Sequence, residues 1–168
     1  MKRFFISVAA LLTLATSTHA CPPPTPHFVG NIGATYNYAL PTSNWSLDNL
    51  GIDYTAGLEL PRRFVTLSVA GNYIFRSHTY QIGGQININP LGAYYGYYTP
   101  VNFSVFAGAG YSNNGGAYIN TGLELTARMG NYFAPYAKAA FRTANLTDTP
   151  AYSIELALGI RLWLGRDW

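Results

Sequence analysis

Apolar and polar residues alternate along most of the chain after Phe28, in blocks separated by turn-forming residues. The last block is the clearest, because one of its faces carries only large aliphatic residues: Ile154, Leu156, Leu158, Ile160, Leu162 and Leu164. The opposite face carries small or polar residues, with Trp163 as the one large apolar exception. Only an extended strand separates residues in this way, because the side chains of a β-strand alternate with a period of two.

Seven earlier blocks show the same alternation and predict further strands. Their ranges are Phe28 to Leu40, Asn49 to Leu60, Phe64 to Phe75, Thr79 to Asn89, Val101 to Tyr111, Tyr118 to Met129 and Phe133 to Thr143. The link from Pro90 to Pro100 leaves one boundary open, because residues 93–98 could extend the following strand in phase. Eight such strands predict an all-β fold, a closed antiparallel up-and-down β-barrel.

The first 20 residues have the layout of a secretory signal peptide: a basic start, an apolar stretch, and Thr18, His19 and Ala20 before the predicted cleavage point. The apolar stretch is shorter than the roughly 20 residues that a transmembrane helix needs. Cys21 comes first after cleavage and is a candidate lipidation site, although the residues before it fit ordinary cleavage better than a lipoprotein signal. We expect residues 21–27 to form a proline-rich spacer and residues 28–168 to form the barrel.

The composition argues against an ordinary soluble surface. Only 10% of the residues are charged and 15% are aromatic, whereas a soluble domain has about 25% charged residues. Removal of the signal peptide with Lys2 and Arg3 lowers the formal net charge from +3 to +1. A clustered basic face, which nucleic-acid binding requires, is therefore not indicated.

The placement of the charges predicts which face of the strands meets lipid. Eight charged residues fall on the polar face of a predicted strand, and none on an apolar face: Asp53, Glu59, Glu124, Arg128, Lys138, Arg142, Glu155 and Arg161. An Arg or Lys on a lipid face costs about 2 to 4 kcal/mol at the midplane. The pattern therefore favours a transmembrane barrel with charged side chains in its lumen, where four acids and four bases can pair. The alternative is a soluble, lipocalin-like barrel with an apolar cavity.

The C-terminal residues Leu156 to Trp168 alternate in the same way and finish on an aromatic residue. In this segment and in overall architecture, the chain resembles the small outer-membrane barrels of Gram-negative bacteria, the group around outer-membrane proteins A and X and the opacity-type barrels. Arg166 departs from that pattern. The resemblance implies an outer-membrane location, contact with outer-membrane lipids and lipopolysaccharide, insertion by the barrel-assembly machinery, and a C-terminal insertion signal made of Ile160, Leu162, Leu164 and Trp168.

The mature chain contains little that could support catalysis. Its histidines are His27, before the first predicted strand, and His78, in a predicted turn beside Ser77. Neighbouring strand residues point to opposite faces, so a Ser–His pair that hydrolyses lipopolysaccharide would need the turn to bend the two together. Two separate histidines and Cys21 make no metal-ligand set. We expect neither an enzyme nor a cofactor.

Two classes of function remain, a structural or surface-interaction protein and a narrow pore for small solutes. The interior of an eight-stranded barrel is just wide enough for its own side chains, which favours the first class. Glycines on the strands would leave some room for water and keep the pore as the alternative: Gly51, Gly57, Gly83, Gly108, Gly122 and Gly159.

The short turn at Gly130 and Asn131 predicts a specific contact. A hairpin centred on Asn131 places Glu124 opposite Lys138, with both side chains pointing inward. Cross-strand partners lie about 4.5 to 5.5 Å apart between Cβ atoms. We therefore expect Glu124 and Lys138 to form an ion pair. The even strand number further predicts that both ends of the mature chain face the periplasm.

Overall fold

The computed structural model describes residues 26–40, 47–60, 64–90, 101–127, 133–146 and 150–164. These ranges contain eight strands and one short 3₁₀ helix, η1. The bounds are β1 His27–Leu40, η1 Leu47–Asn49, β2 Leu50–Glu59, β3 Val65–Ile74, β4 Thr79–Ile88, β5 Val101–Ser112, β6 Gly116–Ala127, β7 Phe133–Ala144 and β8 Ala151–Leu164. Among the described residues, no helix has the length and apolar character needed to cross a membrane.

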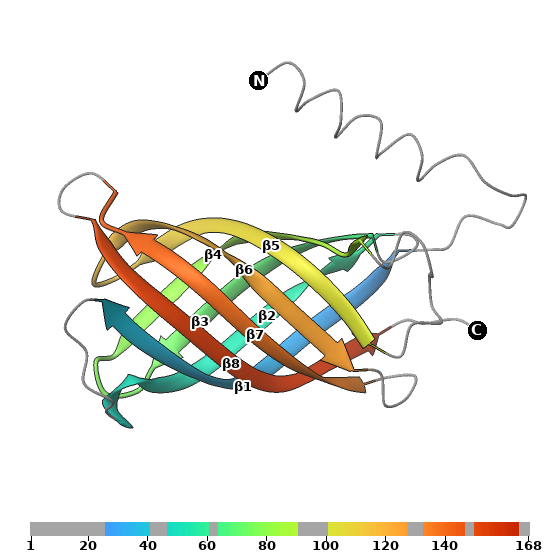
Figure 1. Cartoon of the computed structure of the whole chain (residues 1–168), viewed down its shortest axis with the longest axis horizontal. Helices are drawn as coiled ribbons and strands as arrows, with labels where there is room; N and C mark the ends of the chain where they lie inside the picture. The colour runs from blue at the N-terminus through green and yellow to red at the C-terminus, as the bar shows by residue number, and fades with distance from the viewer. Residues whose placement is uncertain are drawn as a thin grey trace, which may run out of the picture.

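Each strand pairs antiparallel with the next, and β8 returns to pair with β1, so the sheet closes into a barrel (Figure 1). The closing seam runs from Phe28 opposite Leu164 to Leu40 opposite Tyr152. We call the end where β1 begins and β8 finishes the termini end, and the end where β1 leads to β2 the loop end. The predicted closed antiparallel barrel is confirmed.

The observed strand bounds lie within two residues of the predicted ones wherever both are described. His27, which the sequence assigns to the spacer, is the first residue of β1. Strand β6 begins at Gly116, two residues before its predicted start, because the backbone ladder to Ser112 continues past the last residues that alternate clearly. Residues 91–100 lie outside the described residues, and β5 begins at Val101.

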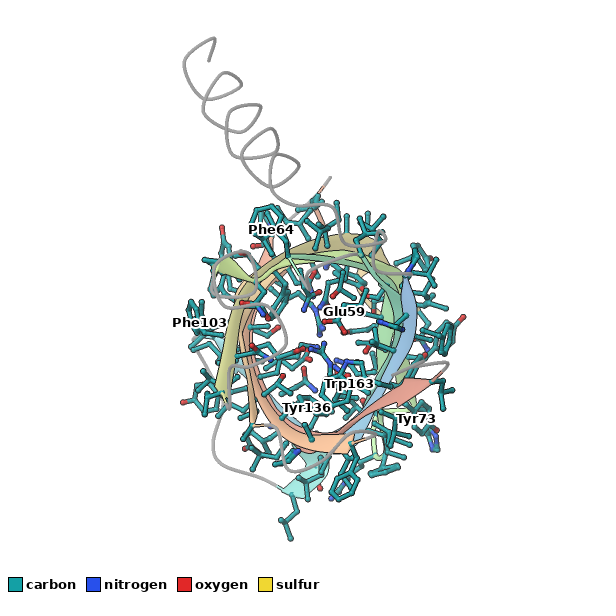
Figure 2. All side chains as sticks on the ribbon, turned by 90° about the vertical axis from the view of Figure 1, so that its right-hand side faces the viewer. Glu59, Phe64, Tyr73, Phe103, Tyr136 and Trp163 are labelled. Carbon is teal, nitrogen blue, oxygen red and sulfur yellow. The ribbon has the colours of Figure 1, made fainter. Side chains whose placement is uncertain are left out.

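Large aliphatic and aromatic side chains cover the outside of the barrel, and Leu158 is 67% exposed there. Figure 2 looks in from the termini end, where Glu59, Tyr136 and Trp163 point inward while Phe64, Tyr73 and Phe103 point outward. A small apolar cluster of Val29, Ala134 and Trp163 lies inside at this end. Most other buried side chains are polar. This distribution is the reverse of the lipocalin-like alternative, which would need an apolar interior.

Candidate functional site

The polar interior of the barrel holds the predicted charged residues. The structure places seven of the eight inside, where the side chains are buried or nearly so: Asp53, Glu59, Glu124, Lys138, Arg142, Glu155 and Arg161. Arg128 lies outside the described residues. Each of the seven occupies an inward position because it lies in phase with the polar residues of its strand. Charges buried in this way must be paired or hydrogen-bonded.

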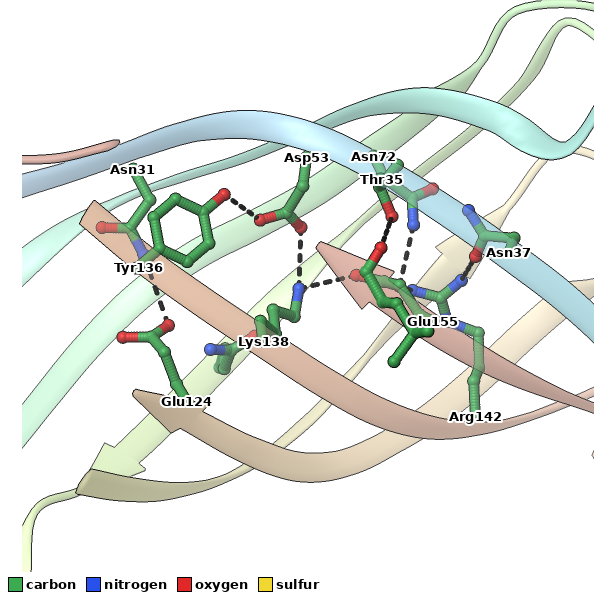
Figure 3. A network of polar contacts seen from close by, with 12 residues as sticks. Asn31, Thr35, Asn37, Asp53, Asn72, Glu124, Tyr136, Lys138, Arg142 and Glu155 are labelled. Atoms are coloured by element: carbon green, nitrogen blue, oxygen red, sulfur yellow. Dashed lines mark hydrogen bonds and ion pairs between the residues drawn. The ribbon is translucent and has the colours of Figure 1, made fainter. Parts of the chain in front are cut away.

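The central cluster is built around Lys138 on β7 and Glu155 on β8 (Figure 3). The Lys138 Nζ lies 2.7 Å from Asp53 Oδ1 and 2.7 Å from Glu155 Oε1, so one ammonium group joins two carboxylates. Arg142 forms a second ion pair with Glu155. The Tyr136 hydroxyl donates to Asp53 Oδ2 at 2.8 Å. Strands β2, β7 and β8 are therefore tied together across the lumen.

Two amides add hydrogen bonds to this cluster. Asn72 on β3 donates its Nδ2 to Glu155 Oε2 at 2.9 Å. Asn37 on β1 accepts a longer hydrogen bond of 3.4 Å from Arg142. The Arg142 guanidinium carbon also lies 5.0 Å from the centre of the Tyr118 ring, within cation–π range. Glu155, which is fully buried, thus receives donors from two other strands, β3 and β7.

A second cluster lies closer to the termini end. Arg161 on β8 forms an ion pair of 2.7 Å with Glu124 on β6. Asn31 on β1 bridges the two, because its Oδ1 accepts from Arg161 Nε at 2.9 Å and its Nδ2 donates to Glu124 Oε2 at 3.3 Å. β6 and β8 are not neighbours, so this contact also crosses the barrel.

Trp163 is the large apolar exception on the polar face of the last strand, and its side chain forms a hydrogen bond there. Its indole Nε1 donates to Glu59 Oε2 at 2.6 Å, and the ring is 2% exposed. A tryptophan buried in a polar interior usually finds such a partner for its N–H group. The alternation did not identify this role, but an out-of-place Trp in an otherwise polar row is the signal that could have found it.

The expected ion pair between Glu124 and Lys138 is wrong, although the register that led to it is confirmed. The two residues are direct cross-strand partners, and both are buried inside the barrel. Lys138 instead binds Asp53 and Glu155, and Glu124 binds Arg161. The physical reason is the narrow lumen of a small barrel, which lets long side chains reach carboxylates on opposite strands as easily as on adjacent ones.

The charges line one side of the lumen. The charged wall is formed by the interior charges of four strands: Asp53 and Glu59 on β2, Glu124 on β6, Lys138 and Arg142 on β7, and Glu155 and Arg161 on β8. Strands β3, β4 and β5 contain no charged residue. Their inward face forms an amide wall: Asn72, Gln81, Gln85, Asn87 and Asn102, with Asn89 directly after β4. A cavity of about 10 Å³ lies between this wall, Glu59 and Arg161 at the termini end, which is about the space that one water molecule needs.

Three aromatic rings fill much of the remaining interior. Each stands directly opposite a glycine of the neighbouring strand: Phe106 opposite Gly122, Tyr118 opposite Gly110, and Tyr136 opposite Gly159. A Cβ atom on Gly159 would lie 2.7 Å from the Tyr136 ring, and one on Gly122 would lie 2.8 Å from Phe106. Phe106 and Tyr118 are not among the residues predicted to point inward, although their phase relative to Ser104 and Asn120 could have revealed it.

The glycines that seemed to leave room for water do not. A Cβ on Gly51, Gly57, Gly83, Gly122 or Gly159 would overlap a carbonyl oxygen of the neighbouring strand. Next to Gly108, the space is taken by the amide oxygen of Asn120. These positions therefore allow close strand packing, and they do not widen the lumen.

The other candidate residues are placed as follows. Ile160, Leu162 and Leu164 are exposed on the outside of β8. Cys21 and Trp168 lie outside the described residues. Ser77 and His78 make no dyad with each other: the Ser77 hydroxyl lies 2.8 Å from that of Thr79, and His78 Nδ1 lies 2.8 Å from the Tyr73 hydroxyl. The turn thus holds these two side chains in separate contacts.

No protein-family model and no curated protein matches the chain. Solved barrels match its fold: a de novo designed transmembrane β-barrel (TM-score 0.55, 14% identity, 85% of this chain and 100% of that one) and Neisserial surface protein A (0.55, 15%, 80% and 96%). The N-terminal β-barrel domain of Pseudomonas aeruginosa OprF matches with a TM-score of 0.53 and 12% identity, over 84% of this chain and 100% of that one. The chain has the fold of small transmembrane β-barrels.

Proposed function

We propose that this chain is a bacterial outer-membrane β-barrel protein with a structural or surface-interaction role. The observation that carries the proposal is the reversed distribution of side chains, with apolar residues outside and paired charges inside. This arrangement is stable in a lipid bilayer, where apolar side chains face hydrocarbon, and it is unfavourable in water. The resemblance and the fold of the solved barrels support the location.

The blocked lumen supports a structural role over a pore. Ion pairs cross the lumen at two depths, Lys138 with Asp53 and Arg161 with Glu124, and three buried aromatic rings occupy further space inside the barrel. The space beside the glycines that favoured a pore is occupied by atoms of the neighbouring strands. Purified protein in a planar lipid bilayer should show no current steps above the lipid baseline. Reproducible single-channel conductance would instead support the narrow pore.

An ordered surface at the loop end supports the surface-interaction role. Asn113 donates to the His78 carbonyl at 3.0 Å, and Asn114 donates to the Thr79 hydroxyl at 2.7 Å, so the β5–β6 turn is fixed to the β3–β4 turn. Arg76 pairs with Asp48 beside them. Nothing in these contacts provides a nucleophile with a base, so the proposal includes no enzymatic activity.

The proposal includes a topology. Both termini face the periplasm after a signal peptide of residues 1–20 is removed, and the loops near Asn44, Ser77, Asn114 and Asp148 face outside. Barrel-assembly machinery recognises the C-terminal segment, and outer-membrane lipids with lipopolysaccharide surround the barrel. In a Cys21→Ser background, Asn114→Cys should react with an impermeant thiol reagent on intact cells, and Asn131→Cys should not. The opposite result would reverse the topology.

Insertion itself can be tested at Leu158. This residue is the most exposed large apolar side chain on the strands of the described chain and lies near the middle of β8. Leu158→Arg should block insertion or cost about 2 to 4 kcal/mol. Leu47→Arg is the matched control, because Leu47 is 82% exposed but lies in η1 at the loop end. Equal, full insertion of both variants would contradict a lipid-facing exterior.

A further inference from the structure

The outside of the barrel has a recess along β7. Its floor is formed by Ala137 and Ala139, and its volume is about 380 Å³. Leucines of the two neighbouring strands stand directly beside these alanines in register: Leu125 and Leu123 on β6, Leu158 and Leu156 on β8. Neighbouring strands lie about 4.8 Å apart. The recess is therefore one strand wide, with an apolar wall on each side.

One wall of the recess is a ridge. Leu158 is 67% exposed because alanines flank it on both sides, Ala137 on β7 and Ala34 on β1. At the β5 side, Phe103 adds a further apolar edge, and Figure 2 shows this ring pointing away from the lumen. A hydrocarbon lying on the alanine floor would thus have carbon atoms on three sides, and dispersion contacts add up over its length.

The height of the recess restricts what can enter it. Ala137 and Ala139 lie at the middle of β7, which runs from Phe133 to Ala144. The apolar band of a membrane barrel is about 25 Å tall, with its polar interfaces at the two rims. A headgroup cannot reach the middle of such a band. The occupant must be a hydrocarbon chain or the apolar surface of another protein.

Two further hollows lie on the loop-end side of the recess. One, of about 440 Å³, lies over β5 to β7 and extends to Thr143. The other, of about 530 Å³, lies beside Tyr152 and Leu40. Phe141, one row above Ala139, separates the two. Phe141 is the next outward residue of β7 after Ala139, so the mid-height recess ends at this ring, and the two hollows beyond it lie nearer the rim at the loop end.

We propose that this recess over Ala137 and Ala139 binds the distal part of one acyl chain of a membrane lipid whose headgroup lies at a rim of the barrel. The inference rests on the proposed membrane location. A second copy of the barrel is a poorer occupant, because a stable protein interface buries at least about 1,000 Å², and a sheet surface would bridge the leucine ridges without entering the narrow recess. A flexible chain fills it along its whole length.

The test uses phosphatidylcholine that carries a diazirine at the end of one acyl chain. The full-length mature protein is reconstituted into vesicles that contain a small fraction of this lipid, irradiated, and mapped by mass spectrometry. We expect cross-links several-fold enriched on β6, β7 and β8 relative to β2, β3 and β4. A diazirine placed next to the ester group should lose this enrichment at Ala137 and Ala139, because it stays near the rim.

The variant Ala137→Leu with Ala139→Leu fills the floor and should abolish the enrichment. The matched control is Ala56→Leu with Ala109→Leu, two exposed alanines on β2 and β5 that do not line the recess, which should leave the cross-links on β7 unchanged. Even labelling around the wild-type barrel, insensitivity to the filled floor, or protein–protein cross-links through β7 would each overturn the proposal. A protein that stays outside the vesicles would instead refute the proposed membrane location.

Discussion

The two walls of the lumen hold the barrel in different ways. On the charged wall, Lys138 on β7 binds Glu155 on the neighbouring β8 and also Asp53 on β2, which is not a neighbour of β7. On the amide wall, Gln85 donates to Asn87, two residues along the same strand, at 2.8 Å. The acceptor oxygens of Gln81 and Gln85 are buried and take no hydrogen bond from the described residues. Long ionic side chains therefore fix the cross-section of the barrel, whereas the amides mainly fill it, apart from Asn72, which donates to Glu155 across the lumen.

The difference matters because the cost of a buried charge depends on its partners. Removing one partner of a buried ion pair costs about 3 to 5 kcal/mol, since the other charge is left without compensation. A neutral hydrogen bond contributes only about 0.5 to 1.5 kcal/mol net. Equal substitutions on the two walls should therefore have unequal effects on the free energy of unfolding.

The largest effect should follow from Glu155→Gln. Glu155 pairs with both Lys138 and Arg142 and accepts from Asn72, so its neutralisation leaves a buried guanidinium without a carboxylate. We expect a loss of about 3 to 5 kcal/mol. Urea unfolding in lipid vesicles, followed by the gel mobility shift between folded and unfolded barrel, measures it. A loss below 1 kcal/mol would mean that the charged wall does not fix the cross-section.

The next effect concerns the partner of Glu124. Glu124→Gln should destabilise the barrel by a similar or slightly smaller amount, because Arg161 keeps its hydrogen bond to Asn31. The exchange Glu124→Arg with Arg161→Glu should recover much of the loss, since Asn31 can reverse its amide between the two. The exchange Glu124→Lys with Lys138→Glu should not recover it. Recovery by the second exchange alone would show that Glu124 pairs across the hairpin.

Glu124 and Lys138 also show what can and cannot be predicted from the sequence. The period-two pattern is enough to predict the closed barrel and the inward direction of Glu124 and Lys138, because alternation and turn position depend on local residues. Their partners depend on which depths of opposite walls meet, and that depends on the stagger accumulated over all strands. The stagger cannot be added up across the link from Pro90 to Pro100, because the sequence does not define where the strand beside it begins. Several carboxylates then lie within reach of each long basic side chain, and the sequence does not determine which one is its partner.

The inward aromatic residues were missed for a related reason. Phe106 and Tyr118 are apolar by type, so a search for polar positions in β5 and β6 passes over them, although both are less than 5% exposed. Their glycine partners are recognised only when the register between strands is known. The sequence thus predicts which face a residue takes, and the pairing of strands decides what that face contains.

A medium effect should follow from Tyr136→Phe. The ring would still cover Gly159, but the hydroxyl that donates to Asp53 at 2.8 Å would be lost. Hydrogen bonds to charged groups contribute about 1.5 to 3 kcal/mol, and Asp53 keeps its ion pair with Lys138. We expect a loss near the lower value in the same urea titration. Tyr118→Phe is the control, because Tyr118 meets Arg142 through its ring face. Equal losses in both variants would assign the effect to packing.

The smallest effect should come from the amide wall, with Gln85→Met. The substitution keeps the length of the side chain, removes one neutral hydrogen bond to Asn87, and also removes a buried acceptor that has no donor among the described residues. These two changes oppose each other, so the free energy of unfolding should change by less than about 1 kcal/mol. Asn87 lines the cavity of about 10 Å³, where a water molecule can take over the lost donor. The urea midpoint should therefore stay close to that of the parent while Glu155→Gln shifts it strongly. A loss as large as that of Glu155→Gln would show that the amide wall holds the barrel as firmly as the charged wall, and the distinction between the two walls would be wrong.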